Sequence, residues 1–576
     1  MADDKSATVT TESAGNREQR RRSARRSKKF AAIGSGAVLI AGVAGPGSVL
    51  LAGPAAAATF NVDSLADDGT GETLREAIVA ANLSAGPDTI TFAAGLSGTI
   101  SLGSDLPNIT DTLSIVGPGA DVLAVDGGGT AGDGDGNQIF YFDSVTSGTN
   151  VVSGLTLTGG YNSYGGAIGL SDGYASLDVI DMVITGNEAE YYGGGVAFDD
   201  STGSLVISGS LITDNLAGEG AGGVYVDSTG DFIISGTTIS DNISEGGGGG
   251  VHVSGEGTMM VEFSEISDNS ADGTGGGFYI YETDVTIESS TISGNSTYSG
   301  GGGVYVDNGS DYSFTMRNST VSGNTSEFYG GGLYFSDSDG SATIENSTIS
   351  GNTAGQAGAI YGGYGGLTLT QVTITANTAT GEGKFTPPLV GGVQLVGAGN
   401  TNSAKASPAA SDKPNKADKP ARGNRVAAAG PGQLEVVGTI IAGNSGQDLG
   451  VYSESGPTVS SDHSVLGTVD AAITVTDVGG TQTGVSDPGL APLAANGGPT
   501  QTHALLDGSA ALNQGPDPVP SFPGNQFDQR GPGFARVAFG FADVGAFEAQ
   551  EDEPVVPPAP DTAPADAIVV TPKFTG

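Results

Sequence analysis

The chain has 576 residues, 99 of which are glycine, and it contains neither cysteine nor tryptophan. Without cysteine there are no disulfides and no thiolate metal sites, so packing and hydrogen bonds must stabilise the fold. The net charge of −43 argues against nucleic acids and anionic membrane surfaces as partners.

Residues 1–58 have the features of an export signal. A basic stretch at residues 20–29 (RRRSARRSKK) precedes a mildly apolar stretch at residues 31–51, and a run of small residues ends at Ala58. No second apolar run long enough to span a bilayer follows, so we expect no membrane span in the mature chain. The predicted location is extracellular or on the cell surface.

Residues 59–150 are assigned to an N-terminal cap and the first repeats. Within them, residues 73–82 carry one apolar stripe, which predicts a short amphipathic helix. Thr73 and Glu76 have the spacing of a capping box. We expect the helix to close the first repeat, because an open solenoid end exposes unpaired strands. The stripe consists of Leu74, Ala77, Ile78 and Ala81.

Residues 151–383 contain two patterns that recur with one period. The first is Ile or Val, any two residues, and then Asn, and successive Asn residues are 25 to 29 positions apart. They are Asn187, Asn215, Asn242, Asn269, Asn295, Asn324, Asn352 and Asn377. The second is a Gly-Gly pair followed by alternating apolar residues, as in GGVYV. Two landmarks with a common period indicate a solenoid.

Each repeat predicts about three short strands, because apolar residues alternate with other residues and show no helical period. This favours one coil of an all-β, parallel β-helix, since a propeller blade requires ~40 residues or more. We expect the Asn residues to lie at a turn, in or near the left-handed conformation, and to form a ladder between coils. Two inward columns would form the core: Val196, Val224, Val251, Phe278, Val304 and Leu333, and then Phe198, Val226, Val253, Ile280, Val306 and Phe335.

Three further segments complete the predicted organisation. Residues 384–432 are rich in Ala, Pro, Lys and Asn, and we interpret them as a basic, disordered insertion that interrupts one coil. Residues 433–549 hold the last coils and a C-terminal region. Residues 550–576 form a tail rich in Pro and Ala.

Several segments resemble known bacterial families. Residues 60–82 (FNVDSLADDGTGETLREAIVAAN) resemble the CSLREA-type domain of β-helix surface proteins, with Glu72-Thr73 in place of Cys-Ser. The segments NGGPT, HALL, DQRG and DVGAFE resemble the choice-of-anchor Q domain. The central repeats are similar to those of polymorphic outer membrane proteins, with Ile or Val in place of the usual Phe. These resemblances imply a right-handed parallel β-helix in a secreted or surface protein, and they carry no catalytic residues.

One outward column of the predicted sheet is aromatic. It consists of Ala197, Tyr225, His252, Tyr279, Tyr305, Tyr334 and Tyr361. Aromatic rings at strand spacing can stack on sugars or anchor a protein partner, and they also stabilise a sheet as cross-strand pairs. We therefore treat the five tyrosines as candidate residues for binding a glycan or a cell-surface partner, with sheet stabilisation as the alternative.

The carboxylates leave a second function open. Asp199 and Asp227 occupy equivalent positions in adjacent repeats, where they could share a proton or a cation in a polysaccharide lyase or glycoside hydrolase. As solvated turn residues they would have no such role. We assign no catalytic residue, and the sequence favours an adhesive or structural protein over an enzyme.

Residues 133–137 contain the only cofactor signal that we weigh. Asp133, Asp135 and Asn137 resemble half of a calcium loop, but the following Gly and the distal Glu of such a loop are missing. A calcium ion therefore remains an open expectation, and a plain turn is the alternative.

Overall fold

The computed structural model describes residues 57–69, 71–171, 173–309, 312–336, 340–362, 366–381, 389–396, 433–452 and 457–550. The described residues all belong to one compact unit, residues 55–576. The predicted export signal, apart from its last two residues, and the tail beyond Gln550 lie outside the described residues. No helix within the described ranges is long and apolar enough to cross a membrane.

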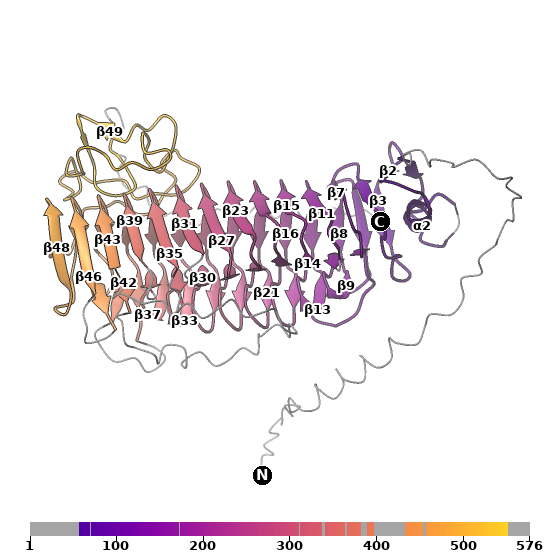
Figure 1. Cartoon of the computed structure of the whole chain (residues 1–576), viewed down its shortest axis with the longest axis horizontal. Coiled ribbons are helices and arrows are strands. Elements are labelled where there is room, and N and C mark those ends of the chain that lie inside the picture. The colour runs from indigo at the N-terminus through magenta and orange to yellow at the C-terminus, as the bar shows by residue number, and fades with distance from the viewer. Residues whose placement is uncertain are drawn as a thin grey trace, which may run out of the picture. The chain divides into compact units, whose positions relative to one another are not determined.

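This unit is a stack of coils whose strands pair in parallel (Figure 1). In one coil, β26 (Phe278–Tyr281), β27 (Asp284–Glu288), β28 (Thr291–Ser293) and β29 (Ser296–Thr297) belong to four different sheets. Each of them pairs with its counterpart one coil later. The fold is therefore the predicted all-β parallel β-helix. It has four strands per coil where about three were expected, because a short strand follows each Asn.

Four large sheets run along the stack. The 15-stranded sheet contains β1 (Thr59–Val62), β2 (Asp88–Phe92), β4 (Leu113–Val116), β7 (Thr149–Ser153), β11 (Ser176–Ile180), β15 (Leu205–Ser208), β19 (Phe232–Ser235), β23 (Thr258–Glu262), β27, β31 (Ser313–Arg317), β35 (Ser341–Glu345), β39 (Leu367–Thr370), β43 (Gln433–Val437), β46 (Thr458–Asp462) and β48 (Thr474–Gly479). The 13-stranded sheet contains β3 (Gly98–Ser101), β5 (Leu123–Asp126), β8 (Thr156–Thr158), β12 (Val183–Thr185), β16 (Leu211–Thr213), β20 (Thr238–Ser240), β24 (Glu265–Ser267), β28, β32 (Thr320–Ser322), β36 (Thr348–Ser350), β40 (Thr373–Thr375), β44 (Ile440–Ile441) and β47 (Val465–Leu466).

The other two large sheets lie on the remaining sides of each coil. The 11-stranded sheet contains β6 (Phe140–Asp143), β10 (Ile168–Ser171), β14 (Val196–Ser201), β18 (Val224–Ser228), β22 (Val251–Ser254), β26, β30 (Val304–Asp307), β34 (Leu333–Phe335), β38 (Ile360–Gly362), β42 (Val390–Leu395) and β45 (Gln447–Val451). The nine-stranded sheet contains β9 (Tyr161–Tyr164), β13 (Glu188–Tyr192), β17 (Leu216–Ala217), β21 (Ile243–Ser244), β25 (Ser270–Ala271), β29, β33 (Thr325–Tyr329), β37 (Thr353–Gln356) and β41 (Thr378–Ala379). A separate antiparallel pair joins β49 (Val537–Ala538) and β50 (Phe541–Ala542).

The predicted inward columns form the core of the stack. Val304 pairs in register with Leu333, and Val306 pairs with Phe335. Every residue of the two predicted columns is buried, with at most 5% of its surface exposed. The alternation that follows each Gly-Gly pair is thus the signal that places the core.

The Asn residues form the predicted ladder. From Asn187 to Asn377, each Nδ2 donates to the Oδ1 of the next Asn at 2.9–3.0 Å. Their backbone is not left-handed, however. The residue before each Asn adopts that conformation, with φ between 55° and 69°. The bend falls there because the Asn side chain itself must point inward to reach its neighbours.

The predicted N-terminal helix is present as α2 (Leu74–Leu83), and it buries the four residues of the apolar stripe. The capping box is absent, since Thr73 makes no side-chain cap bond and its Oγ1 has no partner. Arg75 fixes the helix instead. Its guanidinium pairs with Asp67 at 2.7 Å and donates to the carbonyl of Ser104 at 2.8 Å.

One strand lies inside the predicted insertion, so that boundary requires correction. β42 pairs with β38 and β45 in the 11-stranded sheet, and its GGVQL sequence repeats the Gly-Gly pattern. Because Ala, Pro and Lys dominate the surrounding sequence, the composition of the segment predicts an insertion and not a strand. Residues 382–388 and 397–432 lie outside the described residues.

Residues 487–549, which we call the C-terminal clasp, fold back onto β32, β36 and β40. Gln529 accepts a hydrogen bond from Thr348 at 2.6 Å and donates to Thr320 at 2.9 Å. The Nε2 of His503 lies 2.8 Å from the Oγ of Ser350. These contacts place the loops around β49 at the upper side of the last coils (Figure 1).

Candidate functional site

The predicted aromatic column lies in register along the 11-stranded sheet. Tyr225 pairs with His252, and the pairing continues through Tyr279, Tyr305 and Tyr334 to Tyr361. Because adjacent strands lie ~4.8 Å apart, these side chains form one continuous row.

The rings touch along the whole row. Successive ring centroids are 4.4–5.2 Å apart from Tyr225 to Tyr361. Tyr192 of the nine-stranded sheet extends the row by stacking on Tyr225 at 4.5 Å. Tyr279 and Tyr305 are nearly parallel, with an interplanar angle of 14°, whereas Tyr305 and Tyr334 meet at 76°. Such contacts stabilise the stack whether or not the row binds a ligand.

Burial differs along the aromatic column. Tyr225, His252 and Tyr361 are 5%, 8% and 3% exposed, and they are therefore largely covered. Tyr279, Tyr305 and Tyr334 are half-buried. The surface that a ligand could contact is thus narrower than the sequence predicts, and it centres on three consecutive coils.

Glycines in the turn from the nine-stranded sheet make room for the rings. A Cβ atom at Gly300 would lie 2.5 Å from Cδ1 of Tyr334, and one at Gly247 would lie 3.2 Å from Cδ2 of Tyr279. The rings therefore rest against the turn, which fixes their positions.

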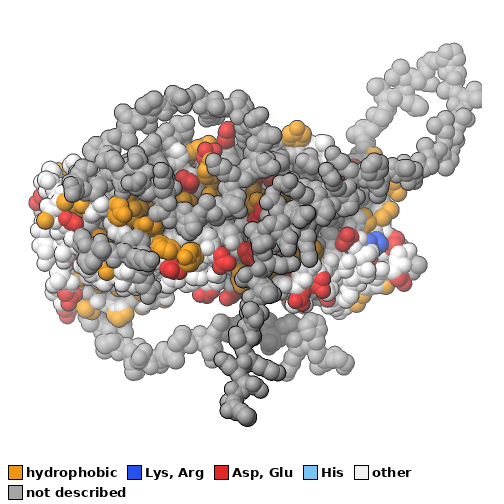
Figure 2. All heavy atoms as spheres, turned by 90° about the horizontal axis from the view of Figure 1, so that it is seen from below, with side chains coloured by type: hydrophobic (Ala, Val, Ile, Leu, Met, Phe, Trp, Pro, Cys, Tyr) orange, Lys and Arg blue, Asp and Glu red, His pale blue; other side chains and the backbone are white. Residues whose placement is uncertain are grey.

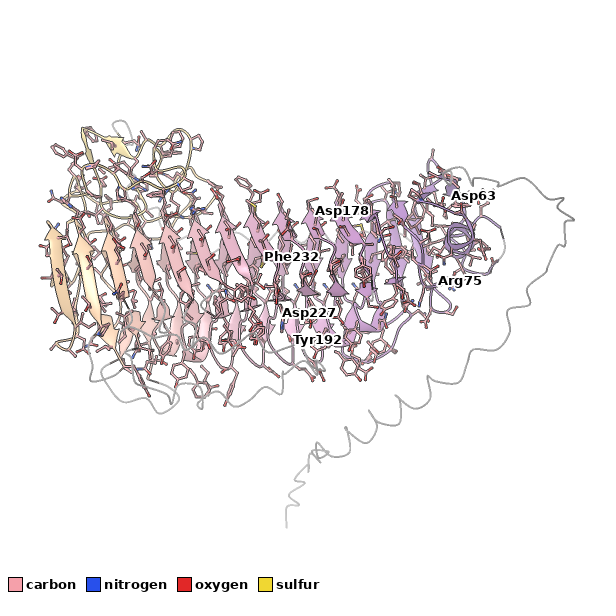
Figure 3. The ribbon with its side chains drawn as sticks, in the orientation of Figure 1. Asp63, Arg75, Asp178, Tyr192, Asp227 and Phe232 are labelled. Carbon is pink, nitrogen blue, oxygen red and sulfur yellow. The ribbon has the colours of Figure 1, made fainter. Side chains whose placement is uncertain are left out.

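A second column, two residues further along each strand, mixes carboxylates with other side chains, in the order Asp199, Asp227, Ser254, Tyr281 and Asp307. Asp199 pairs in register with Asp227, as predicted, and Tyr281 pairs with Asp307. Burial raises the pKa of the Tyr225 hydroxyl well above its usual range, and Asp199 and Asp227 raise this pKa further. Tyr192 and Asp227 lie on the same, lower side of the coils (Figure 3).

His252 is the one imidazole in the aromatic column. Burial lowers its pKa to about 4, so the ring is neutral at neutral pH. Its Nδ1 has no hydrogen-bond partner. His463 and His503 lie in the last coils and the clasp, so the structure does not bring the three histidines together.

The aromatic column ends at Gln394, and a second buried amide, Gln356, lies on the neighbouring nine-stranded sheet. Gln394 follows Tyr361 in register and is 1% exposed, and Gln356 follows Tyr329 and is 4% exposed. The Oε1 atoms of both, and that of Gln447, accept no hydrogen bond. The rings of Tyr329 and Tyr361 lie 5.0 Å apart beside these amides.

The basic side chains of the described ranges lie elsewhere. Arg75 pairs with Asp67 near α2, and Arg317 pairs with Glu345 on the 15-stranded sheet. Arg530 and Arg536 are buried in the clasp. Among the described side chains that Figure 2 shows from below, hydrophobic ones lie next to acidic ones.

The calcium candidates lie in a turn before β6. Asn137 donates through Nδ2 to the carbonyls of Leu102 and Gly127. Glu188, on β13, accepts the N–H groups of Gly132 and Gly134, which flank Asp133. Among the described residues, no group of three or more His, Cys, Asp or Glu side chains is placed to hold a metal ion. Calcium at Asp133, Asp135 and Asn137 stays a prediction.

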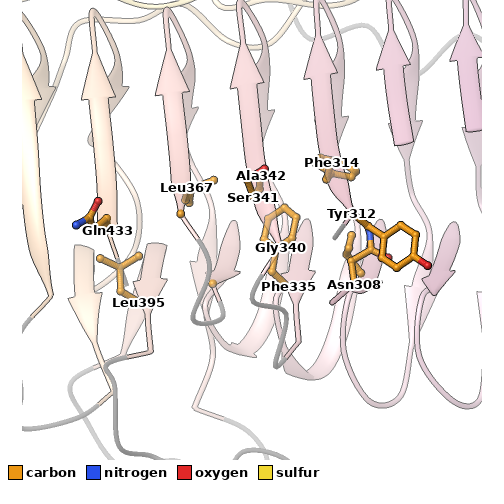
Figure 4. A pocket seen from close by; sticks show the side chains of 13 residues that line it. Asn308, Tyr312, Phe314, Phe335, Gly340, Ser341, Ala342, Leu367, Leu395 and Gln433 are labelled. Carbon is orange, nitrogen blue, oxygen red and sulfur yellow. The ribbon is translucent and has the colours of Figure 1, made fainter. Parts of the chain in front are cut away.

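A small cavity of ≈ 20 Å³ lies at the corner between the 11- and 15-stranded sheets. Inward residues of both sheets line it, among them Phe335, Leu395, Phe314 and Leu367 (Figure 4). Its volume holds about one water molecule. Asn308, Tyr312, Ser341 and Gln433 add polar groups to the otherwise apolar lining.

The clasp contains a buried charged network that sequence reasoning missed. Arg530 donates to Asp528 at 2.7 Å, and its guanidinium lies 3.9 Å from the ring centroids of both Phe534 and Phe547. Burial, followed by the charge of Asp543, raises the pKa of Glu548 to about 8. The DQRG and DVGAFE segments, which resemble the choice-of-anchor Q domain, hold these charged residues. Charged residues within an otherwise apolar region were the sequence signal for a buried charged network.

The comparisons with known proteins support the fold. A family model described as a right-handed β-helix region matches residues 166–349 and agrees with the predicted hand. No curated protein matches the sequence. One similar solved structure is the A-module of mannuronan C-5 epimerase AlgE6 from Azotobacter vinelandii, with a TM-score of 0.26 and 11% identity over 71% of this chain and 90% of that chain. At that TM-score the similarity carries no argument about activity. The resemblances to the CSLREA, choice-of-anchor Q and polymorphic outer membrane families stay predictions.

Proposed function

We propose that this chain is an exported, extracellular or cell-surface protein that binds an extended glycan along its aromatic column. The supporting observation is the unbroken contact of the rings, with Tyr279, Tyr305 and Tyr334 half-buried in consecutive coils. The coil spacing of ~4.8 Å is close to the rise of one pyranose unit in an extended chain. A glycan that runs along the stack would therefore meet one ring per sugar.

The basic and apolar segments of residues 1–58 support export. A parallel β-helix suits an adhesive role, because its stacked coils present one side chain type at a fixed spacing over a long surface. The protein's function in this proposal is adhesion, and the sugar remains unchanged.

A glycan array probed with the exported chain tests the proposal. The variant Tyr279→Ser/Tyr305→Ser/Tyr334→Ser should lose binding, while Tyr174→Ser should retain it. Tyr174 is 66% exposed and lies outside the column, so it controls for the loss of a surface aromatic ring. Unchanged binding by a folded triple variant would contradict the proposal. Release of reducing or unsaturated ends would instead support the enzymatic alternative, with Asp199 and Asp227 as the carboxylates to test.

A further inference from the structure

A buried carboxylate lies beside the residue that precedes the first strand. Asp88 begins β2 and is only 2% exposed, and its Oδ1 accepts the backbone N–H of Ala58 at 2.7 Å. Its Oδ2 has no hydrogen-bond partner among the described residues. Within the same part of the chain, no Lys, Arg or His side chain forms an ion pair with Asp88. A buried carboxylate is costly unless a cation pairs with it.

The C-terminal end of α2 lies at the same carboxylate. The hydroxyl of Ser84, the C-cap residue of α2, donates to Oδ1 of Asp88 at 3.3 Å. The last turn of the helix holds no basic residue, although a cation is favourable at a helix C-terminus. A positive charge on the nitrogen of Ala58 would therefore stabilise both the carboxylate and the end of the helix.

Removal of the export signal would create that positive charge. Ala55 and Ala57 are small residues at the third and first positions before the Ala57–Ala58 bond, which is the pattern cleaved by the endopeptidase that removes export signals. Hydrolysis breaks the C–N bond. Water supplies the second oxygen of the Ala57 carboxylate and the two protons that convert the nitrogen of Ala58 into an ammonium group. Its three N–H donors, in place of one, suffice for both oxygens of Asp88.

The neighbouring bond, between Ala58 and Thr59, also follows small residues at the required positions. The structure distinguishes the two bonds. The carbonyl of Ala58 accepts the N–H of Thr89 at 2.9 Å, where the pairing of β1 with β2 begins. Cleavage after Ala58 would remove this hydrogen bond together with the bond to Asp88. Cleavage after Ala57, which is exposed, removes neither of them.

We infer that the mature chain begins at Ala58, after cleavage of the Ala57–Ala58 bond, and that its terminal ammonium group pairs with Asp88 to close the first coil. This inference rests on the export part of the proposed function and is independent of glycan binding. It moves the predicted end of the export signal by one residue. It also links processing to folding, because the ion pair forms only after the bond is cut.

The first test is the mass and N-terminal sequence of the chain that a bacterial host exports. We expect the sequence ATFN, which begins at Ala58. An exported chain that begins at Thr59, or at any other residue, would overturn the inference and leave export intact. A chain that stays inside the cell with residues 1–57 attached would overturn both.

The second test measures the ion pair. Two forms of the mature chain are prepared with a removable leader, one that begins at Ala58 and one that retains residues 55–57 before it. Hydrogen exchange of the β2 amides should be about tenfold slower in the form that begins at Ala58, because hydrogen bonds between charged groups are stronger than neutral ones. Equal exchange in the two forms would overturn the inference.

Two substitutions, each made in both forms, identify the partner of the ammonium group. Asp88→Asn keeps an oxygen acceptor but removes the charge, so the two forms should then exchange at the same rate. Asp63→Asn is the matched control, because it removes an exposed carboxylate just after β1 and should preserve the difference. A difference that persists in Asp88→Asn would come from the added residues and not from the ion pair, and the inference would be wrong.

Discussion

The asparagine ladder ends at Asp448, which accepts the last side-chain hydrogen bond of the ladder from Asn444. The Nδ2 of Asn444 donates to Asp448 Oδ1 at 2.9 Å, where each earlier Asn donates to another amide oxygen. The second oxygen of Asp448 accepts the N–H of Thr468 at 2.7 Å. All side-chain donors in the ladder point toward this end, so the carboxylate terminates a chain of aligned amides that polarise one another.

Replacement of one member should weaken the whole stack. In Asn324→Ala, the side-chain and backbone donors of Asn295 lose their common acceptor, and Asn352 loses a donor. Because Asn324 is fully buried, water cannot replace these bonds, and we expect a loss of ~2–4 kcal/mol in the free energy of unfolding. Chemical denaturation measures it. Thr325→Ala changes the next, exposed residue and should have little effect. Equal effects would show that the ladder is not the source.

The turn glycines make a second, position-specific prediction. A Cβ at Gly302 would lie 2.4 Å from the carbonyl oxygen of Gly331 and 2.5 Å from that of Thr325, and backbone atoms cannot move aside cheaply. A Cβ at Gly332 would lie 2.8 Å from the oxygen of Ala359. Alanine already stands at 359, the equivalent position one coil later. We expect Gly302→Ala to lower stability by more than ~3 kcal/mol and Gly332→Ala by about 1 kcal/mol. Similar denaturation midpoints for the two variants would refute this distinction.

The repeat made much of the fold predictable. A fixed period shows which residues stack, so the burial of Val304 and Val306 and the bonds between Asn295 and Asn324 follow from one alignment. The register of Tyr279 with Tyr305 follows from the same period. The burial of each ring in the column does not follow from the period, because residues from neighbouring turns cover Tyr225 and Tyr361.

Local patterns without a period were less informative. The Thr73 and Glu76 spacing predicts a cap, but the long-range pair of Arg75 and Asp67 fixes the helix instead. The clasp contacts join residues far apart in sequence, such as Thr348 and Gln529, and the repeat pattern does not predict which residues meet. Tertiary contacts of this kind depend on chain topology that a single sequence does not encode in a simple pattern.

The stability of the clasp around Arg530 should depend on the shape of the guanidinium group as well as on its charge. Arg530 donates through two nitrogens to Asp528 and through Nη2 to the carbonyl of Glu548, while its plane lies between two phenylalanine rings. Lysine cannot reproduce this fork. Arg530→Lys should destabilise the clasp by ~2–4 kcal/mol, measured as faster hydrogen exchange at residues 527–548.

Arg317→Lys is the matched control for the Arg530 experiment. Arg317 pairs with Glu345 on the outer surface of the 15-stranded sheet, where an ion pair contributes ~0–1 kcal/mol. Hydrogen exchange in the clasp should therefore stay unchanged in this variant. If Arg530→Lys also leaves clasp exchange unchanged, the fork geometry is unimportant.

Glu548 should make the clasp less stable as the pH rises. Its pKa is raised from 4.5 to about 8 by burial and by the charge of Asp543, so the folded state holds a proton that the unfolded state releases. Between these two values the folded state binds more protons, and its stability therefore falls with increasing pH. Burial also raises the pKa of Asp543, which adds to the same trend. Hydrogen exchange of the clasp, measured across this pH interval, should show the loss of stability.

Glu548→Gln removes one titrating group and should flatten the pH dependence of clasp stability, even though it alters the bonds to the N–H groups of Ala538 and Asp543. Glu435→Gln, at an exposed position on β43, should leave the slope as it is. A slope in Glu548→Gln as steep as in the unaltered chain would assign the pH dependence to another group.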